Sequence, residues 1–279
     1  MGARCTIFLS RIINAVDFEE KYGILWLLWQ EKCPPYFSLA LLRDMEYGVS
    51  TISNRTFAAA DLLRYFVLRS RRGNIFNLGG DLEFFKQMIV SGDRDALLSY
   101  AKQSADMMYT LYSGFEKGVT TVALVQGKCI GGGLEAAVAC DYIVAERHSE
   151  FCFPEIQLGI FLGMGVLPVL ARRLNKHDYE DLCHSGRNFS TEELANMGLI
   201  DVVADKGQGE QVIMKWIKKR YGALRSHQTM SCIRKSAAQL SRADFHSGLE
   251  SWVDVVMSLD KRRLALLSFA IDKQHAGVQ

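Results

Sequence analysis

The sequence predicts an α/β fold in which strands and helices alternate along the chain, and three observations support this. Runs of β-branched and aromatic residues at 64–69, 120–125 and 141–145 are typical of strands. Segments between them carry apolar residues at every third or fourth position, which is typical of helices. The 279 residues are 49% hydrophobic with only four prolines, which suits one large domain or one and a half and excludes disordered or collagen-like chains.

The first half of the chain is predicted to contain an amphipathic lead-in, a strand and a long helix. The lead-in spans residues 37–47, and the strand at 64–69 is followed by a turn at 71–74. The long helix spans about 93–117, because its apolar residues repeat at spacings of three and four along one face. These residues stand at positions 97, 98, 101, 105, 108, 111, 112 and 115.

The second half begins with a buried strand at 120–125, a short helix at 134–140 and another strand at 141–145. Because strands and helices alternate here too, ligand sites are expected at the strand-to-helix turns.

The last part of the chain is predicted to be helical. Residues 190–193 (Ser-Thr-Glu-Glu) form a capping box that opens a short helix to Met197, and Gly198 ends it. From Lys206 onward the chain is mostly helical. We therefore divide it into an α/β core with its lead-in at residues 1–205 and a helical C-terminal region at residues 206–279.

Charge, cysteines and histidines exclude several classes of protein. A net charge of +2 is too balanced for a dedicated nucleic-acid binder. Seven cysteines without a C-x-x-C pair favour reduced thiols over disulfides or structural zinc, and the six histidines lack metal-ligand spacing, so neither a metal nor a cofactor is expected. The apolar window at 24–29 is far shorter than the roughly 20 residues of a membrane span. Acidic residues soon after the start argue against a signal peptide, so we expect a soluble cytoplasmic protein.

Two glycine-rich turns are candidates for binding a ligand through the backbone. Residues 78–81 (Leu-Gly-Gly-Asp) and 130–133 (Ile-Gly-Gly-Gly) each follow an apolar stretch and open a helix. Glycine lets the backbone approach a ligand closely, and a helix N-terminus adds partial positive charge. Two such turns side by side would hold a developing oxyanion between two N–H groups. Alternatively, each is only a tight turn between a strand and a helix.

Two glutamates are candidates for acid/base chemistry. Glu135 stands in the first turn of the short helix, and Glu155 lies in the mostly apolar stretch 151–156. Burial raises the pKa of a carboxyl group and suits it to proton transfer near neutral pH. As alternatives, Glu135 interacts only with the helix dipole, and Glu155 is paired with Arg172 or Arg173.

A dinucleotide site is a competing interpretation of the second turn. Gly131-x-Gly133-x-x-Ala136 matches the Rossmann fingerprint by letter, and Glu146 ends the next strand. Only about ten residues separate the glycines from that strand, which is short for a crossover helix. A nucleophilic serine is not indicated, because no G-x-S-x-G motif is present.

Four motifs in order along the chain resemble the crotonase (enoyl-CoA hydratase) superfamily. They are residues 77–82 (Asn-Leu-Gly-Gly-Asp-Leu), Gln126-Gly127 followed by Gly131-Gly132-Gly133-x-Glu135, Pro154-Glu155, and Gly163-Met164-Gly165. The twenty residues from Glu135 to Glu155 are also the spacing of the two glutamates in the family's hydratases. The resemblance covers roughly residues 60–205. It implies a crotonase-like spiral core of ββα units, with a C-terminal helical region that serves oligomerisation and covers the acyl pocket.

Within that superfamily the chain most resembles the diffusible signal factor synthases, bacterial enzymes that make cis-2-unsaturated fatty acid signals for quorum sensing. The similar segments are residues 35–42, 76–82, 91–95, 124–127 and 135–137, together with Trp252. This resemblance implies dehydration of a 3-hydroxyacyl-acyl-carrier-protein thioester to the cis-2-enoyl thioester, followed by thioesterase release of the free acid.

The resemblance also implies roles for particular residues. The backbone N–H groups of Gly80 and Gly132 would form the oxyanion hole, with Gly131 beside the substrate. Glu155 would remove the C2 proton, and Glu135 would assist departure of the C3 hydroxyl. Three residues resemble positions of the acyl tunnel and are equally compatible with plain core packing: Met164, Trp252 and Leu266.

Two features bear on the substrate. Many coenzyme A hydratases of this family carry a lysine where this chain has Glu83, which weakens a coenzyme A phosphate site. Residues 206–235 hold eight Lys/Arg against one acid, a surface that would steer an acidic carrier protein or simply form a solvated helix face or subunit contact.

Two other functions remain open: an ordinary enoyl-CoA hydratase/isomerase of fatty acid breakdown that acts on acyl-CoA, and a non-catalytic crotonase-fold protein that binds a regulator. The resemblance further implies a homotrimer or a hexamer, and a complex with the receiver domain of a sensor kinase.

Overall fold

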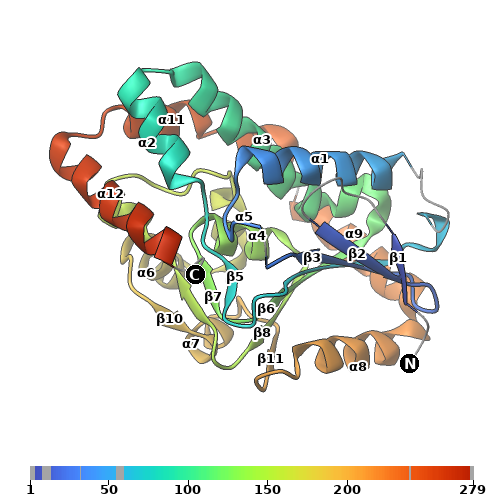
Figure 1. Ribbon diagram of the computed structural model, residues 1–279. Helices are drawn as coiled ribbons and strands as arrows, with labels where there is room; N and C mark the ends of the chain where they lie inside the picture. Colours follow the sequence, from blue (N-terminus) through green and yellow to red (C-terminus); the bar gives the residue numbers. More distant parts are fainter. Residues whose placement is uncertain (1–3, 8–13, 32, 55–59, 239, 277–279) are drawn as a thin grey trace.

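The computed structural model describes residues 4–7, 14–31, 33–54, 60–238 and 240–276. Within them the chain forms two β-sheets surrounded by helices (Figure 1). The larger sheet has the order β1(Arg4–Ile7), β2(Asn14–Glu19), β3(Ile24–Trp29), β4(Tyr65–Ser70), β6(Thr120–Val125), β8(Tyr142–Glu146) and β11(Val202–Ala204). The smaller has the order β10(Phe189–Ser190), β9(Glu150–Cys152), β7(Lys128–Ile130) and β5(Ile75–Asn77).

The core repeats one unit, in which a strand of the larger sheet is followed by a strand of the smaller sheet and then a helix. The order is β4–β5–α2, then β6–β7–α4, then β8–β9 and the 3₁₀ helix η3. Strands β3, β4, β6, β8 and β11 pair in parallel, as do β5, β7 and β9. The expected α/β spiral of ββα units is therefore confirmed.

The predicted helices of the core are present with bounds that differ by a few residues, and α5 and α6 were not expected. Their bounds are α1(Leu39–Ser53), η1(Ala60–Leu62), α2(Leu82–Ser91), α3(Arg94–Ser113), η2(Gly114–Gly118), α4(Gly132–Ala139), η3(Pro154–Leu158), α5(Leu167–Arg173), α6(Lys176–His184) and α7(Thr191–Asn196). The capping box at Ser190 and Glu193 is present. The predicted long helix stops at Ser113 rather than residue 117, because Gly114 takes the left-handed conformation with φ 61° and the next two residues also have positive φ.

Three N-terminal strands were not expected from the sequence. β1 and β2 form an antiparallel hairpin that joins β3, and β3 pairs in parallel with β4. All six residues of β3 (Ile-Leu-Trp-Leu-Leu-Trp) are buried, so this strand has no polar face and no alternating pattern. The short apolar window noted above is therefore a central strand.

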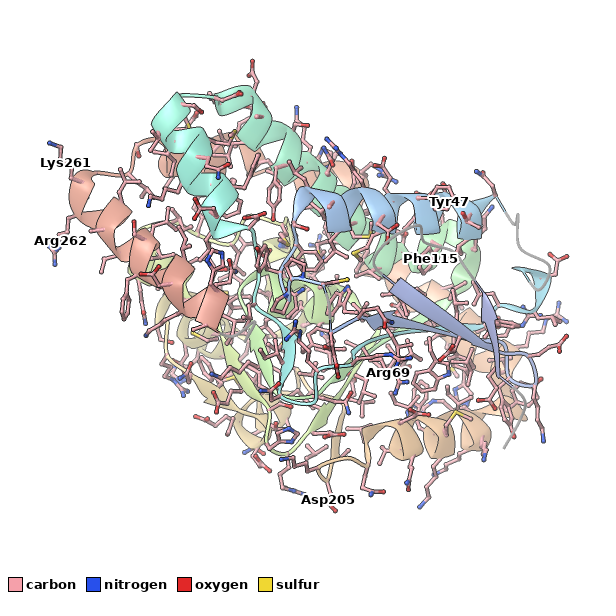
Figure 2. All side chains as sticks on the ribbon, viewed as in Figure 1. Tyr47, Arg69, Phe115, Asp205, Lys261 and Arg262 are labelled. Atoms are coloured by element: carbon pink, nitrogen blue, oxygen red, sulfur yellow. The ribbon has the colours of Figure 1, made fainter. Side chains whose placement is uncertain are left out.

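The two faces of the larger sheet are covered by different helices. Alternate residues of β4 point to opposite sides, with Phe66 in one core cluster and Val67 in the other. The first face is covered by α1, α3 and α4, and the second by α8(Gly209–Tyr221) through Ile213 and Ile217. Arg69 of β4, labelled in Figure 2, forms a salt bridge with Glu210 and fixes the start of α8 on this second face.

The remaining C-terminal helices pack onto the core. They are α9(Leu224–Ala238), α10(Arg242–His246), α11(Leu249–Met257) and α12(Lys261–Ala276). Helices α10 and α11 lie against α3, whereas α12 lies against α2 and η3 (Figure 1). No helix in the described part of the chain is long and apolar enough to cross a membrane.

Candidate active site

The two glycine-rich turns lie directly against each other. A Cβ atom placed on Gly79 would be 3.1 Å from the backbone nitrogen of Gly132. A Cβ atom on Gly133 would be 2.4 Å from the carbonyl oxygen of Asn77, closer than real side chains come. Only glycine allows the two backbones to approach this closely. The expected juxtaposition of the two turns is therefore present.

Hydrogen bonds account for the backbone polar groups of the first turn with one exception. The N–H groups of Leu78 and Gly79 donate to Pro35 O and Asn77 Oδ1, and the carbonyl of Gly79 accepts from Phe37 N–H. Two more hydrogen bonds are formed at the end of the turn. Gly80 O accepts from Gln274 Nε2, and Asp81 N–H donates to Tyr100 Oη. Among the backbone groups of residues 78–81, only the N–H of Gly80 has no partner within the described residues.

The second turn leaves a second N–H group free. Gly131 has φ 53° and ψ −126°, a conformation that residues with a Cβ rarely adopt. Its N–H donates to Cys152 O, and its carbonyl accepts from the N–H groups of Leu134 and Glu135. Gly132 opens α4 and, within the described residues, its N–H donates to no acceptor. Two unpaired N–H groups therefore stand on two touching turns, at a helix N-terminus that favours negative charge.

Glu135 projects from the first turn of α4 and is only 1% exposed. Its carboxylate accepts from the backbone N–H of Met164 at 3.0 and 3.3 Å. Burial, and next the negative charge of Glu155, raise the pKa of Glu135 to about 8, although backbone N–H donors at Met164, Val166 and Gly163 oppose the shift. Glu135 is thus a buried acid oriented by the backbone.

Glu155 approaches from η3 on the other side of the second turn. Its Oε1 lies 2.6 Å from where a Cβ of Gly131 would stand. Its Oε2 is inaccessible to water and has no hydrogen-bond partner in the described chain. Burial raises the pKa of Glu155 to about 7. Burial, and next the negative charges of Glu135 and Glu155, raise the pKa of the Cys183 thiol to about 12.

The alternative pairing of Glu155 with an arginine is wrong. Arg172 donates to Pro168 O, within its own helix. Arg173 donates to the carbonyls of Val138, Cys140 and Leu199 and lies 3.6 Å from Asp201. Its guanidinium is held among three backbone carbonyls and that aspartate, so it does not neutralise Glu155.

Sequence comparison assigns this arrangement to a family. A model of the enoyl-CoA hydratase/isomerase family matches residues 54–254, which include both glycine turns and both glutamates. The chain belongs to the enoyl-CoA hydratase/isomerase family. The crotonyl-CoA hydratase of Syntrophomonas wolfei is 29% identical over 263 residues, which cover 94% of this chain and 92% of that protein.

Two further similarities differ in how far they extend. A mevalonyl-coenzyme A hydratase of Aspergillus fumigatus is 39% identical over 87 residues, 31% of this chain, so the chain matches only about a third (32%) of that relative's length. The solved enoyl-CoA hydratase of Bacillus halodurans superposes with a TM-score of 0.74 at 18% identity, covering 95% of this chain and 99% of the other. At that identity the superposition shows the fold of the hydratase/isomerase family.

The three residues expected in the acyl tunnel have different positions. The Sδ and Cε atoms of Met164 lie over Gly132, 2.7 and 2.5 Å from a Cβ placed there. Trp252 is buried, packs on Gly163 and donates from Nε1 to Phe161 O at 2.9 Å. Leu266 lies on α12 with 44% of its surface exposed, so it does not have the burial expected of an acyl-tunnel residue.

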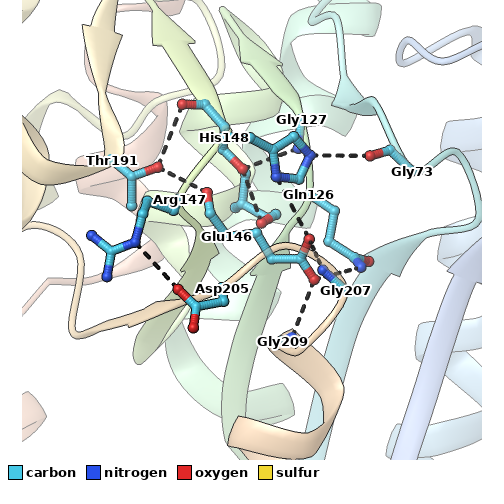
Figure 3. Close-up of polar contacts among 12 residues, drawn as sticks. Gly73, Gln126, Gly127, Glu146, Arg147, His148, Thr191, Asp205, Gly207 and Gly209 are labelled. Atoms are coloured by element: carbon cyan, nitrogen blue, oxygen red, sulfur yellow. Dashed lines mark hydrogen bonds and ion pairs between the residues drawn. The ribbon is translucent and has the colours of Figure 1, made fainter.

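Glu146, the acid of the competing dinucleotide interpretation, has a structural task. Its carboxylate accepts from Gln126 Nε2 at 3.0 Å and from the N–H groups of Gly207 and Gly209 at 2.8 and 3.1 Å (Figure 3). It thereby fastens the turn that opens α8, beside His148 and Arg147 (Figure 3). Because its oxygens are bound by the chain itself, we reject the dinucleotide interpretation.

Three residues that hold the first turn were missed by sequence reasoning. Asn77, Tyr100 and Gln274 come from β5, α3 and α12, and each bonds the backbone between residues 78 and 81. Asn77 alone carried a local signal, because it begins the motif at residues 77–82, but its bond to the turn was not predicted. Tyr100 and Gln274 occupy ordinary helical positions, so no pattern marks them.

Proposed function

We propose that this chain catalyses the reversible loss of water from a 3-hydroxyacyl thioester to give the 2-enoyl thioester. The observation that supports it is the buried carboxylate of Glu135 and the half-buried Glu155, whose Oε2 is inaccessible to water, beside two unpaired N–H groups. A thioester carbonyl bound by Gly80 N–H and Gly132 N–H develops negative charge when the C2 proton leaves, and these donors stabilise it. Removing one such donor typically costs about 10²- to 10³-fold in rate.

The two glutamates divide the proton transfers. Glu155, ionised, takes the proton from C2, and the electron pair of that bond forms the C2–C3 double bond. Glu135, protonated, gives its proton to the C3 hydroxyl, which leaves as water. The two glutamates together carry one proton before and after the step. In the reverse reaction Glu155 is therefore protonated and Glu135 is ionised at the start. Raised pKa values near 7 and 8 suit both roles at neutral pH.

The finer proposal is a diffusible signal factor synthase-like enzyme. It would dehydrate a 3-hydroxyacyl-acyl-carrier-protein thioester to the cis-2-enoyl thioester and then hydrolyse that thioester to the free acid. Glu83 supports a substrate without coenzyme A phosphates, because it stands in the first turn of α2 after Asp81. Burial, and next the negative charges of Asp81 and Glu83, raise the pKa of the nearby Tyr36. Anionic phosphates are disfavoured beside two carboxylates.

The basic surface at 206–235 does not support carrier-protein steering toward this site. Its described part lies on α8 and α9, and α8 covers the second face of the larger sheet. Glu135 and Met164 belong to the first face. Arg220 of this surface also stacks on Trp216, with its guanidinium carbon 4.1 Å from the ring centre. We therefore base the carrier-protein proposal on Glu83 and the motif resemblance alone.

The testing experiment gives purified protein a medium-chain 3-hydroxyacyl thioester on acyl carrier protein and, separately, on coenzyme A. Products are identified by mass spectrometry for the wild type, Glu135→Gln and Glu155→Gln. The exposed Glu150→Gln serves as a matched control that retains activity. Dehydration lost in both site variants supports the two-glutamate mechanism, and full activity in either one contradicts it.

The product decides the finer proposal. Free cis-2-enoic acid supports the synthase. A trans-2-enoyl thioester without free acid indicates the ordinary hydratase, and no conversion of either thioester would favour the regulator-binding protein.

Assembly, partners and location belong to the same proposal. We propose a trimer or hexamer, a cytoplasmic location and, by resemblance to the synthases, a complex with a receiver domain. Exposed apolar residues on α9 and α12 offer surface for self-association: Met230, Ile233 and Phe269. Light scattering after gel filtration measures the oligomer, and a monomer at micromolar concentration would contradict it.

A further inference from the structure

Helix α12 reaches the first glycine turn through one buried side chain. Gln274 is 5% exposed, and its Nε2 donates to Gly80 O at 2.9 Å and to Leu78 O at 3.2 Å. These two carbonyls flank Gly79 and the peptide unit that carries the unpaired N–H of Gly80. Gln274 therefore constrains the turn on both sides of that donor.

The orientation of the Gln274 amide follows from its partners. Both are carbonyl oxygens, which only accept, so the NH₂ end must face the turn. The Oε1 atom consequently points away from the turn, is buried, and has no hydrogen-bond partner in the described chain. Burying an acceptor that has no donor costs free energy, because the hydrogen bonds to water are lost and not replaced. Such an atom therefore indicates a donor supplied by a ligand.

The same helix also contacts the segment that carries Glu155. The guanidinium group of Arg263 lies 2.5 Å from where a Cβ of Gly159 would stand, and Gly159 ends η3. At the other end of α12, Gln274 contacts Leu78 and Gly80, in the turn that leads to Asp81, the residue that caps α2. Helix α12 thus spans from the Glu155 segment to the Gly80 turn, along the side of the molecule occupied by α2 (Figure 1).

We propose that Gln274 joins substrate recognition to the oxyanion hole: Nε2 positions the Gly80 turn, and Oε1 accepts a hydrogen bond from an amide N–H of the thioester's pantetheine arm. This inference rests on the proposed acyl-thioester function. The pantetheine arm is common to coenzyme A and acyl-carrier-protein thioesters, continues from the sulfur next to the carbonyl, and carries secondary amides. An amide N–H is the donor that a buried amide oxygen requires.

Binding of the pantetheine arm to Gln274 would also improve catalysis, because it fixes the side chain that holds the Gly80 turn. With Oε1 engaged, the Gln274 side chain loses its remaining freedom, and Nε2 holds the two carbonyls of the turn in place. The Gly80 N–H then stays aimed at the thioester oxygen without reorganisation during the reaction. Gln274 is therefore a positioning residue for the carbonyl.

The experiment uses two chromophoric cinnamoyl-type thioesters, one on pantetheine and one on ethanethiol, which lacks the amides. Red-shifted absorbance on binding reports polarisation of the carbonyl, and titration gives Kd. Gln274→Met keeps the length of the side chain and removes both polar atoms, while the exposed Gln211→Met on α8 is the matched control. Circular dichroism verifies folding, and Gln274→Asn replaces the Met variant if that variant does not fold.

The proposal expects two separate losses in the Gln274 variant. The red shift shrinks for both thioesters, because the turn is no longer held. Kd rises about 10-fold more for the pantetheine thioester than for the ethyl thioester, because only the former loses a hydrogen bond. Equal changes in Kd overturn the contact with the arm, and an unchanged red shift overturns the positioning role. No red shift in the wild type removes the oxyanion hole and the inference with it.

A wild type that shifts the absorbance but dehydrates no substrate would refute the proposed reaction alone. The comparison of the two thioesters would still decide the role of Gln274, since it depends on binding and not on turnover.

Discussion

The backbone N–H of Met164 donates to both carboxylate oxygens of Glu135, at 3.0 and 3.3 Å. The side chain of the same methionine lies over Gly132, whose N–H is one of the two free donors. One residue thus orients Glu135 and covers Gly132, the glycine proposed to form part of the oxyanion hole. This coupling explains how a loop without regular structure positions two parts of the site at once.

The pH dependence of dehydration should be bell-shaped. Glu155, with a pKa of about 7, must be ionised, so activity rises as the pH passes that value. Glu135, with a pKa of about 8, must be protonated, so activity falls above it. Burial is the largest cause of the raised pKa of Glu135 and the charge on Glu155 is the second, so the two groups titrate as a pair. We expect kcat/KM to peak between these values, and a flat profile from about pH 5 to pH 10 would contradict the assignment.

Glu135→Gln should stabilise the protein relative to the wild type, and this difference should increase as the pH rises. The pKa of Glu135 in the folded protein, about 8, exceeds its ordinary value of 4.5, so its contribution to stability is full below pH 4.5 and is lost as the pH rises through 8. Each unit of pKa difference corresponds to about 1.4 kcal/mol, and we expect the variant to gain at least about 2 kcal/mol at pH 9 relative to the wild type.

Thermal unfolding at about pH 5 and about pH 9 measures this, since the gain should be small at the lower pH. The exposed Glu150→Gln is the control and should show no such trend. An equal effect at both pH values would mean that the charge of Glu135 is not its cause.

Gly131→Ala should abolish activity while the control Gly73→Ala does not. The alanine Cβ would stand 2.6 Å from Glu155 Oε1, and the φ of 53° at residue 131 is unfavourable for any L side chain. We expect a loss of more than about 100-fold in kcat together with a destabilisation of about 1–3 kcal/mol. Nothing lies within 4 Å of a Cβ on Gly73. Near-normal turnover by Gly131→Ala would show that catalysis does not require the carboxylate of Glu155 at its present position.

The chemistry-bearing segments were predictable because their signals are local. The strand at residues 120–125 is a short run of β-branched and apolar residues. Both glycine turns and both glutamates stand at fixed places beside strands or helix starts. The contact between the C-terminal helix and the first glycine turn was not predictable. Gln274 meets Gly80 across 194 residues of sequence, and nothing near either position indicates the contact. The N-terminal strand β3 was missed because burial on both faces removes the alternation that marks strands.

Tyr100→Phe should weaken the oxyanion hole without touching a substrate atom. The Tyr100 hydroxyl donates to Phe37 O at 2.7 Å and accepts from Asp81 N–H at 3.2 Å, so it ties the lead-in to the first turn. Its removal leaves a buried carbonyl and a buried N–H unpaired, which costs about 1–3 kcal/mol of stability. We expect kcat to fall about 10-fold with little change in KM, because the Gly80 N–H is less firmly held.

The exposed Tyr221→Phe is the matched control. A stability loss with unchanged kcat would assign Tyr100 to folding alone, whereas a kcat loss that exceeds the effect on KM would place it in support of the thioester carbonyl.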